Sequence, residues 1–147
     1  MSVDPVEKLE RRIGYRFADR ARLERALTHA SYAAEHPPCE HQLALAFVGD
    51  AVLALVVGEY LVRAEPDAAV GRLTTRRAEL VADETLARWA SALELGPLLR
   101  LGRGAEQTGG RETASMLATA LEALLGALYE EAGLVAVRRV VGDLAGW

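Results

Sequence analysis

Residues 41–62 read HQLALAFVGDAVLALVVGEYLV, and this stretch decides the fold. Between His41 and Gly58 its only charged residue is Asp50, which directly follows a glycine. An apolar run of this length without proline predicts a helix that is buried over most of its surface. A charged side chain is rarely buried without a partner, so Asp50 lies on an exposed stripe, is paired, or belongs to a site.

A second apolar run, SMLATALEALLGALYEE at residues 115–131, again has a single acid in its interior, Glu122, near a glycine. Glycine destabilises a helix, so Gly49 and Gly126 predict a close backbone approach between the two helices. If the helices cross there, Asp50 and Glu122 face each other. Two facing carboxylates need a shared proton, an arginine or a divalent cation. The residues alone therefore indicate a candidate metal site with two acidic ligands.

The remaining sequence predicts amphipathic helices. Residues with the chemistry of helix caps precede three of them: Asp4, Asp19 and Asp83. EHPPCEH, residues 35–41, is expected to be a loop because two prolines cannot continue a helix. The glycine-rich LGRGAEQTGGR, residues 101–111, is expected to be a second loop, and the Arg138-Arg139 pair to lie on the outside of the last helix. We predict one all-α domain over residues 1–147, with two buried central helices, 44–62 and 115–131, surrounded by amphipathic ones.

Composition excludes several classes of protein. The chain has 147 residues, of which 51% are hydrophobic and 26% charged, which is typical of a folded globular domain rather than a disordered one. Cys39 is the single cysteine, so no disulfide framework is expected. The N-terminus has no signal peptide pattern, and the most apolar window, residues 43–57, is too short for a membrane span. These features predict a cytoplasmic protein with no membrane association.

The charge balance makes any contact with nucleic acid a local property of the surface. The formal net charge is −4, so binding would need a patch of arginines. The best candidates for such a patch are four arginines in the basic clusters of the sequence: Arg76, Arg77, Arg103 and Arg111. A solvated surface is the alternative interpretation for each. His29 is expected to be a packed, hydrogen-bonded histidine rather than a catalytic base.

Four segments, in order, resemble the endonuclease domain of the ribonuclease III family. They are LERRIGYRFADRARLERALTHASY, FVGDAVLALVVGEYL, GRLTTRRAELVADETLARWA and LGRGAEQTGGRETASMLATALEALLGALYEE. The resemblance covers residues 8 to about 140 in register. It implies an all-α homodimer that cleaves double-stranded RNA with Mg²⁺. It also implies that Phe47 inserts into a socket on the partner subunit.

The resemblance places four carboxylates around the metal, and this sequence retains two of them. Asp50 and Glu122 stand at the matching positions and are the candidate catalytic and metal-binding residues. Ala46 and Thr119 stand where the family has a glutamate and an aspartate. Each lost carboxylate removes a ligand and a negative charge, so Mg²⁺ binding is expected to be weak. The pattern predicts a preserved scaffold around a degenerate site.

Three functions remain open at this stage. The first is a catalytically inactive or impaired family member, a pseudoenzyme that acts as a dimeric module for binding double-stranded RNA or for scaffolding. It could pair as a homodimer or as a heterodimer with a catalytically complete family member. The second is an active Mg²⁺-dependent endoribonuclease in RNA processing, and the third is an all-α interaction module without RNA. Family members from bacteria add a double-stranded-RNA-binding domain after this one, and a chain that stops at Trp147 without it is expected to bind RNA weakly.

Overall fold

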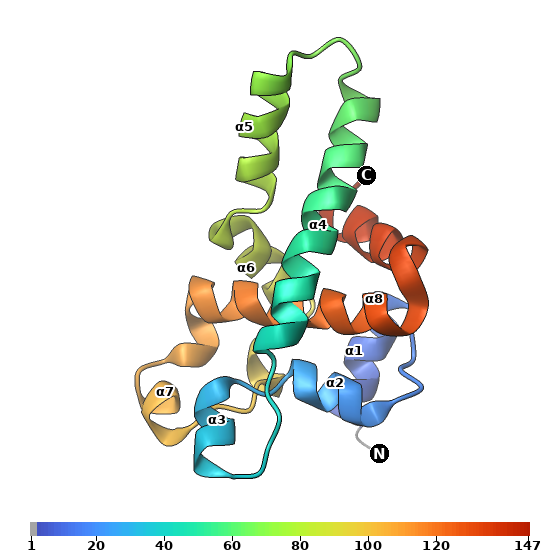
Figure 1. Ribbon diagram of the computed structural model, residues 1–147. Helices are drawn as coiled ribbons and strands as arrows, with labels where there is room; N and C mark the ends of the chain where they lie inside the picture. Colours follow the sequence, from blue (N-terminus) through green and yellow to red (C-terminus); the bar gives the residue numbers. More distant parts are fainter. Residues whose placement is uncertain (1–2) are drawn as a thin grey trace.

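The computed structural model describes residues 3–147, and its regular structure in this range is helical (Figure 1). An isolated bridge between Thr28 and Arg100 is the only β pairing in the described part of the chain. The helices, in chain order, are α1 (Pro5–Ile13), α2 (Arg20–Ala26), α3 (Ala30–Glu35), α4 (Leu43–Ala64), α5 (Val70–Leu80), α6 (Asp83–Ala92), α7 (Arg103–Gln107) and α8 (Ala114–Ala145), with 3₁₀ turns η1 (Gly96–Leu98) and η2 (Gly110–Glu112). The predicted all-α class is confirmed.

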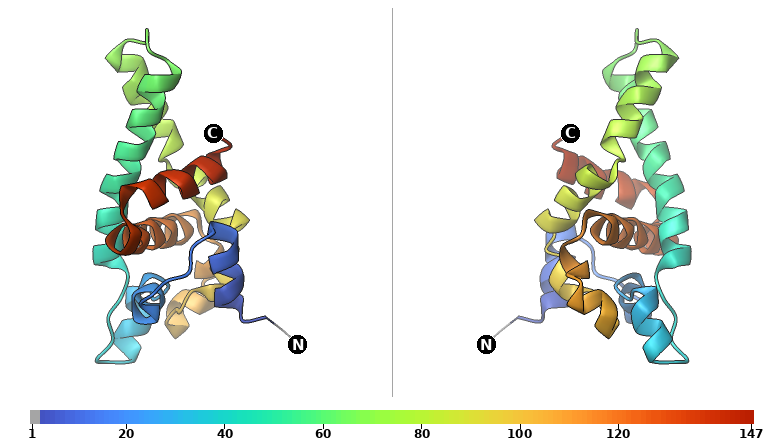
Figure 2. Two further views of the ribbon diagram at one scale, coloured as in Figure 1. Left: turned by 90° about the vertical axis from the view of Figure 1, so that its right-hand side faces the viewer. Right: turned by 90° about the vertical axis from the view of Figure 1, so that its left-hand side faces the viewer.

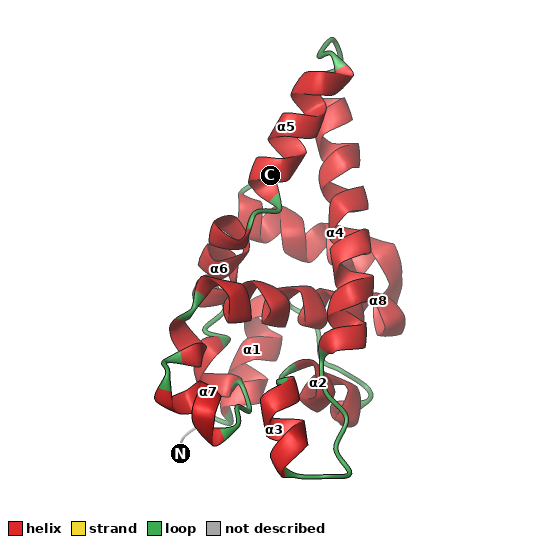
Figure 3. Cartoon of the chain, turned by 60° about the vertical axis from the view of Figure 1, so that its left-hand side comes forward, coloured by secondary structure: helices red, strands yellow, loops and turns green. Residues whose placement is uncertain are grey.

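Helices α4 and α8 cross at the centre of the molecule (Figures 1 and 3). A β-carbon on Gly49 would overlap the backbone carbonyl of Glu122, and one on Gly126 would overlap that of Leu45. The two helices therefore touch backbone to backbone, as the paired glycines predicted. Leucines of both helices fill the surrounding core, and the fully buried ones include Leu45, Leu53, Leu121, Leu124, Leu125 and Leu128.

The long apolar helix α4 has 22 residues and is long and apolar enough, by length and composition, to cross a membrane. Its ends lie within two residues of the predicted helix 44–62, and the most apolar window, residues 43–57, is only part of it. Its buried residues pack against the other helices of the bundle, chiefly α8. This packing accounts for its apolar composition, because a central core helix meets the same length and hydropathy criteria.

The second half of α4 and the whole of α5 form an arm that projects from the rest of the fold (Figures 1 and 3). No residue of α5 is buried. Val62 on α4 and Val70 on α5 are 57% and 76% exposed. The arm therefore contributes little to the hydrophobic core of a single chain.

Helix α8 changes direction at Gly133, whose φ of 80° and ψ of −174° are not helical. The segment that follows turns back and packs beside α4, as Figure 2 shows. Arg138 donates to Glu59 of α4 at 3.1 Å, and Arg139 donates to the carbonyls of Ile13 and Gly14 at 3.1 Å. Arg139 is exposed and Arg138 half-buried, so the pair lies at the surface of the last helix as expected, and both side chains also hold that segment in place.

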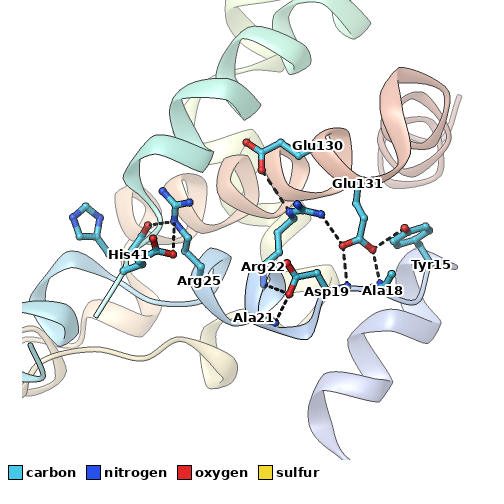
Figure 4. A network of polar contacts seen from close by, with 10 residues as sticks. Tyr15, Ala18, Asp19, Ala21, Arg22, Arg25, His41, Glu130 and Glu131 are labelled. Atoms are coloured by element: carbon cyan, nitrogen blue, oxygen red, sulfur yellow. Dashed lines mark hydrogen bonds and ion pairs between the residues drawn. The ribbon is translucent and has the colours of Figure 1, made fainter. Parts of the chain in front are cut away.

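Glu131 of α8 connects three parts of the chain (Figure 4). It accepts hydrogen bonds from the Tyr15 hydroxyl at 2.8 Å, the backbone N–H groups of Ala18 and Asp19, and the Arg22 guanidinium at 3.0 Å. Burial tends to raise the pKa of Glu131, but these four donors together lower it below its ordinary value. The carboxylate thus anchors the loop between α1 and α2 to the central helix.

Two helix starts are confirmed and two local predictions are wrong. Asp4 and Asp19 each accept a hydrogen bond at 3.0 Å from an N–H of the following first turn. Asp83 is the first residue of α6 and makes no capping hydrogen bond, since Ala82 stands at the cap position. Residues 101–111 are not a plain loop, because α7 and η2 form within them.

Candidate functional site

The site lies where α4 crosses α8. Asp50 is exposed on α4, and Glu122 is partly buried on α8 directly beside it. Burial raises the pKa of Glu122 to about 8, helped by its hydrogen bond to Asp50 and by the charges of Asp50 and Asp83. Glu122 is therefore mostly protonated near neutral pH, which relieves the repulsion expected of two facing carboxylates.

The positions beside this pair supply little further metal-binding capacity. Ala46 is buried and has no oxygen to offer. The Thr119 hydroxyl donates to the carbonyl of Ser115 at 3.0 Å, which leaves its lone pairs free. Within residues 3–147, no group of three or more His, Cys, Asp or Glu side chains is close enough to share a metal ion.

The donor set nevertheless fits a partly hydrated Mg²⁺. In proteins this ion is commonly held by one or two carboxylates and keeps several waters, with substrate phosphates completing its shell. Asp50 and Glu122 would be the protein ligands, and the Thr119 hydroxyl oxygen could accept a hydrogen bond from a bound water. The sequence missed Asp83, which the start of α6 brings near enough to influence Glu122. No local pattern marks Asp83, because its proximity depends on how α6 packs along α8.

Phe47 lies on the solvent-facing side of α4 and is 81% exposed. Leu43 and Leu55, each 50% exposed, lie on the same side, with the small residues Ala44 and Ala51 between them. We call this set the α4 face. A contiguous apolar surface of this kind is typical of a protein interface.

The four candidate RNA-binding arginines have different environments. Arg111 donates to Glu106 at 2.6 and 2.8 Å and to the carbonyls of Gly96 and Leu99, so it is part of the loop structure. Arg76 pairs with Glu79 at 2.7 Å.

Arg77 and Arg103 are exposed and have no ion pair in the described part of the chain. They are the two of the four whose charge is available for a ligand. His29 caps α3 by accepting from the N–H of Ser31, and burial lowers its pKa, with a contribution from His41. This environment agrees with the packed role expected for His29.

Comparison with known proteins assigns this arrangement to one family. The family described as Ribonuclease-III-like matches residues 19–145. The ribonuclease 3 of Heliobacterium modesticaldum is 50% identical over 141 residues, which cover 95% of this chain and 60% of that protein. The enzyme of the same name from Caulobacter vibrioides is 50% identical over 142 residues, covering 97% of this chain and 62% of that protein. The chain thus spans about three fifths of the length of these relatives.

A solved structure gives the same result for the fold. The nuclease domain of ribonuclease III from Campylobacter jejuni superposes with a TM-score of 0.89 at 40% identity, covering 95% of this chain and 94% of that one. Structural flexibility has been described for that domain in the region involved in dimer formation. The likeness extends over nearly the whole chain.

Proposed function

This chain belongs to the ribonuclease III family, and we propose that it is a homodimeric module for binding double-stranded RNA whose nuclease activity is impaired. The observation that carries the proposal is the composition of the site. Asp50 and Glu122 stand together, while Ala46 and Thr119 beside them provide no carboxylate. The helices that carry the site are in place, but the site has two carboxylates where the family has four.

The two missing carboxylates lower the affinity of the site for Mg²⁺. Mg²⁺, when bound, would supply an activated water and stabilise the leaving oxygen of a phosphodiester. Asp50 and Glu122 would hold it, and Glu122 must first lose its proton because only the carboxylate is a ligand. With a pKa of about 8, Glu122 is mostly protonated at neutral pH. Proton competition therefore weakens a site that already lacks two ligands.

The dimer is proposed to form through the α4 face. A two-fold axis makes an apolar face self-complementary, since each copy presents the same residues to the other. Phe47 projects from the face and would bury its ring against the partner, which contributes on the order of 2–3 kcal/mol per subunit. Asp50 lies on the same helix, one turn from Phe47, so dimer formation would place the two sites near a common surface.

RNA binding is proposed to depend mainly on phosphate contacts. Among residues 3–147, the guanidinium groups of Arg77 on α5 and Arg103 on α7 form no ion pair. Contacts of this type release counterions, so RNA affinity should fall steeply as the salt concentration rises. Affinity for a long RNA duplex that does not change with salt would favour an interaction module without an RNA role.

The test is to rebuild the site with Ala46→Glu and Thr119→Asp. We expect the wild type to cleave duplex RNA slowly with Mg²⁺ and the double variant to cleave it faster. Each single variant should gain less, because ligands of one ion act as a unit. Ala64→Glu, which adds a carboxylate at the exposed end of α4 outside the α4 face, is the matched control and should gain no activity.

Thermal stability provides a second measurement that does not depend on RNA contacts. Without metal the double variant should be less stable than the wild type, because four carboxylates crowd one site. Mg²⁺ should restore that loss by binding the folded state only. A double variant that gains neither Mg²⁺-dependent stability nor cleavage would show that positions 46 and 119 do not complete the site.

An active Mg²⁺-dependent endoribonuclease is the second candidate, and the retained pair favours it. Asp50 and Glu122 remain in contact across the helix crossing, and two carboxylates are within the number that Mg²⁺ commonly uses. Efficient cleavage of duplex RNA by the wild type, abolished by Glu122→Gln, would establish this function. The impaired-activity proposal would then be wrong, while the dimer and RNA contacts would still stand.

A further inference from the structure

A separate pocket lies between the second half of α4 and the last segment of α8. Its volume is about 280 Å³. The residues that line it are Val56, Glu59, Tyr60, Arg63, Arg138, Arg139 and Trp147. Tyr60 is ten residues beyond Asp50, about 15 Å along the helix, and the lining residues of α4 lie on the side away from Asp50. The pocket is therefore not part of the candidate metal site.

The charge of this pocket is positive. It has three guanidinium groups and, among the described residues that line it, a single carboxylate, that of Glu59. Glu59 contacts Arg138 at 3.1 Å and Arg63 at 3.5 Å. The side chain of Arg63 remains 73% exposed, so it can turn to a ligand without leaving a buried contact. The side chains of the site thus carry an excess of positive charge, and Arg63 is its accessible guanidinium.

One wall of the pocket is aromatic. The indole of Trp147 stacks on the ring of Tyr60, with 3.6 Å between centroids and 5° between planes. Trp147 is still 38% exposed, so part of its ring can contact a further planar group. A positively charged pocket beside a stacked aromatic pair has the chemistry that recognises a base and its phosphate together.

We propose that this pocket binds a nucleoside monophosphate, either free or as the phosphorylated end of an RNA strand. A phosphate monoester carries nearly two negative charges, which suit a pocket with an excess of positive side chains. Arg63 would contact the phosphate, since guanidinium groups pair with phosphate oxygens in bidentate fashion. The base would lie against Trp147, and the volume is at the small end of ligand pockets, suited to one nucleotide.

The experiment titrates the protein with AMP and follows tryptophan fluorescence and heat of binding. The chain has two tryptophans, and Trp89 is buried, so a fluorescence change on binding reports Trp147. We expect quenching by AMP, weaker binding of inorganic phosphate and of adenosine, and weaker binding at high salt. A 5′-phosphorylated RNA strand and the same strand without its phosphate distinguish a strand end from a free nucleotide.

Three variants make the test specific. Arg63→Gln should weaken AMP binding about tenfold or more, as expected for the loss of a charge-assisted hydrogen bond. Glu59→Gln should tighten it several-fold, because the competing carboxylate is gone. Arg72→Gln removes an equally exposed arginine on the arm and should leave AMP binding unchanged. Thermal unfolding of each variant verifies that the fold is intact.

Absence of AMP binding at millimolar concentration would overturn the proposal. So would equal affinity for AMP and inorganic phosphate, since the aromatic wall would then take no part. Equal loss of binding in Arg63→Gln and Arg72→Gln would show diffuse charge attraction instead of a site. None of these outcomes bears on RNA cleavage, so the proposed function is tested independently.

Discussion

At the scale of single residues, the proton on Glu122 links the site to protein stability. Its folded pKa of about 8 exceeds the ordinary value of 4.5. A group with a raised folded pKa contributes stability below the unfolded pKa and loses it as the pH rises through the folded pKa. The metal-free protein should therefore lose stability between about pH 4.5 and 8.

Glu122→Gln should remove this pH dependence. The glutamine stays neutral, so the variant should unfold at a higher temperature than the wild type at pH 8 in the presence of a chelator. Asp50→Asn should also stabilise the metal-free protein, because it removes the negative charge beside Glu122. Thermal unfolding across pH 5 to 9 measures both, with the exposed Glu84→Gln as control. A destabilising Asp50→Asn would mean that Asp50 has a favourable partner.

The contribution of Glu131 to stability has the opposite pH dependence. Its folded pKa is lowered by its four donors, so its contribution is present above the unfolded pKa and lost as pH falls through the folded pKa. Glu131→Gln should lower the free energy of unfolding at pH 7 by about 2–3 kcal/mol, the usual size for hydrogen bonds to a charged group. Glu130→Gln is the matched control, because Glu130 is exposed and has one long ion pair, 3.6 Å, with Arg22. Denaturant unfolding should separate the two variants, and equal losses would contradict the anchoring role.

At the scale of helices, the crossing of α4 and α8 depends on the absence of two side chains. Gly49→Ala should destabilise by about 3 kcal/mol, the upper end for overpacking, because its methyl group would meet backbone that cannot move aside. Gly142→Ala, in α8, has open space around it and should be neutral or stabilising by up to about 1 kcal/mol. Denaturant unfolding measures both. Equal tolerance of the two alanines would contradict the close crossing.

Some features of the helices and their packing could be predicted from the sequence, and others could not. The apolar runs, the caps at Asp4 and Asp19 and the glycine pair are local signals, and from them the central crossing and the facing acids could be predicted. Glu131, Asp83 and Arg138 could not be placed, because their partners are far away in sequence. The expectation of a loop for residues 101–111 was also wrong, because α7 forms there. Arg111 stabilises this segment by its hydrogen bonds to Glu106 and to the carbonyl of Gly96.

At the scale of the whole molecule, the α4 face predicts a dimer. Phe47→Ala should weaken self-association about a thousandfold or more, because two rings are lost per dimer at roughly 2–3 kcal/mol each. Sedimentation over a range of protein concentrations measures the change. Val135→Ala, which shortens an apolar side chain that is 73% exposed on α8, is the control. A wild type that is monomeric at micromolar concentration would refute the interface.

The arm has a consequence for measuring assembly. Since α5 buries no residue, opening it costs little free energy, and its amide hydrogens should exchange with deuterium far faster than those at the crossing of α4 and α8. Contact with RNA or with a second chain would slow that exchange in α5 while leaving the core unchanged. The exchange rate of these amides therefore reports whether the arm contacts RNA or a second chain, and it can be measured in the unmodified protein under native conditions.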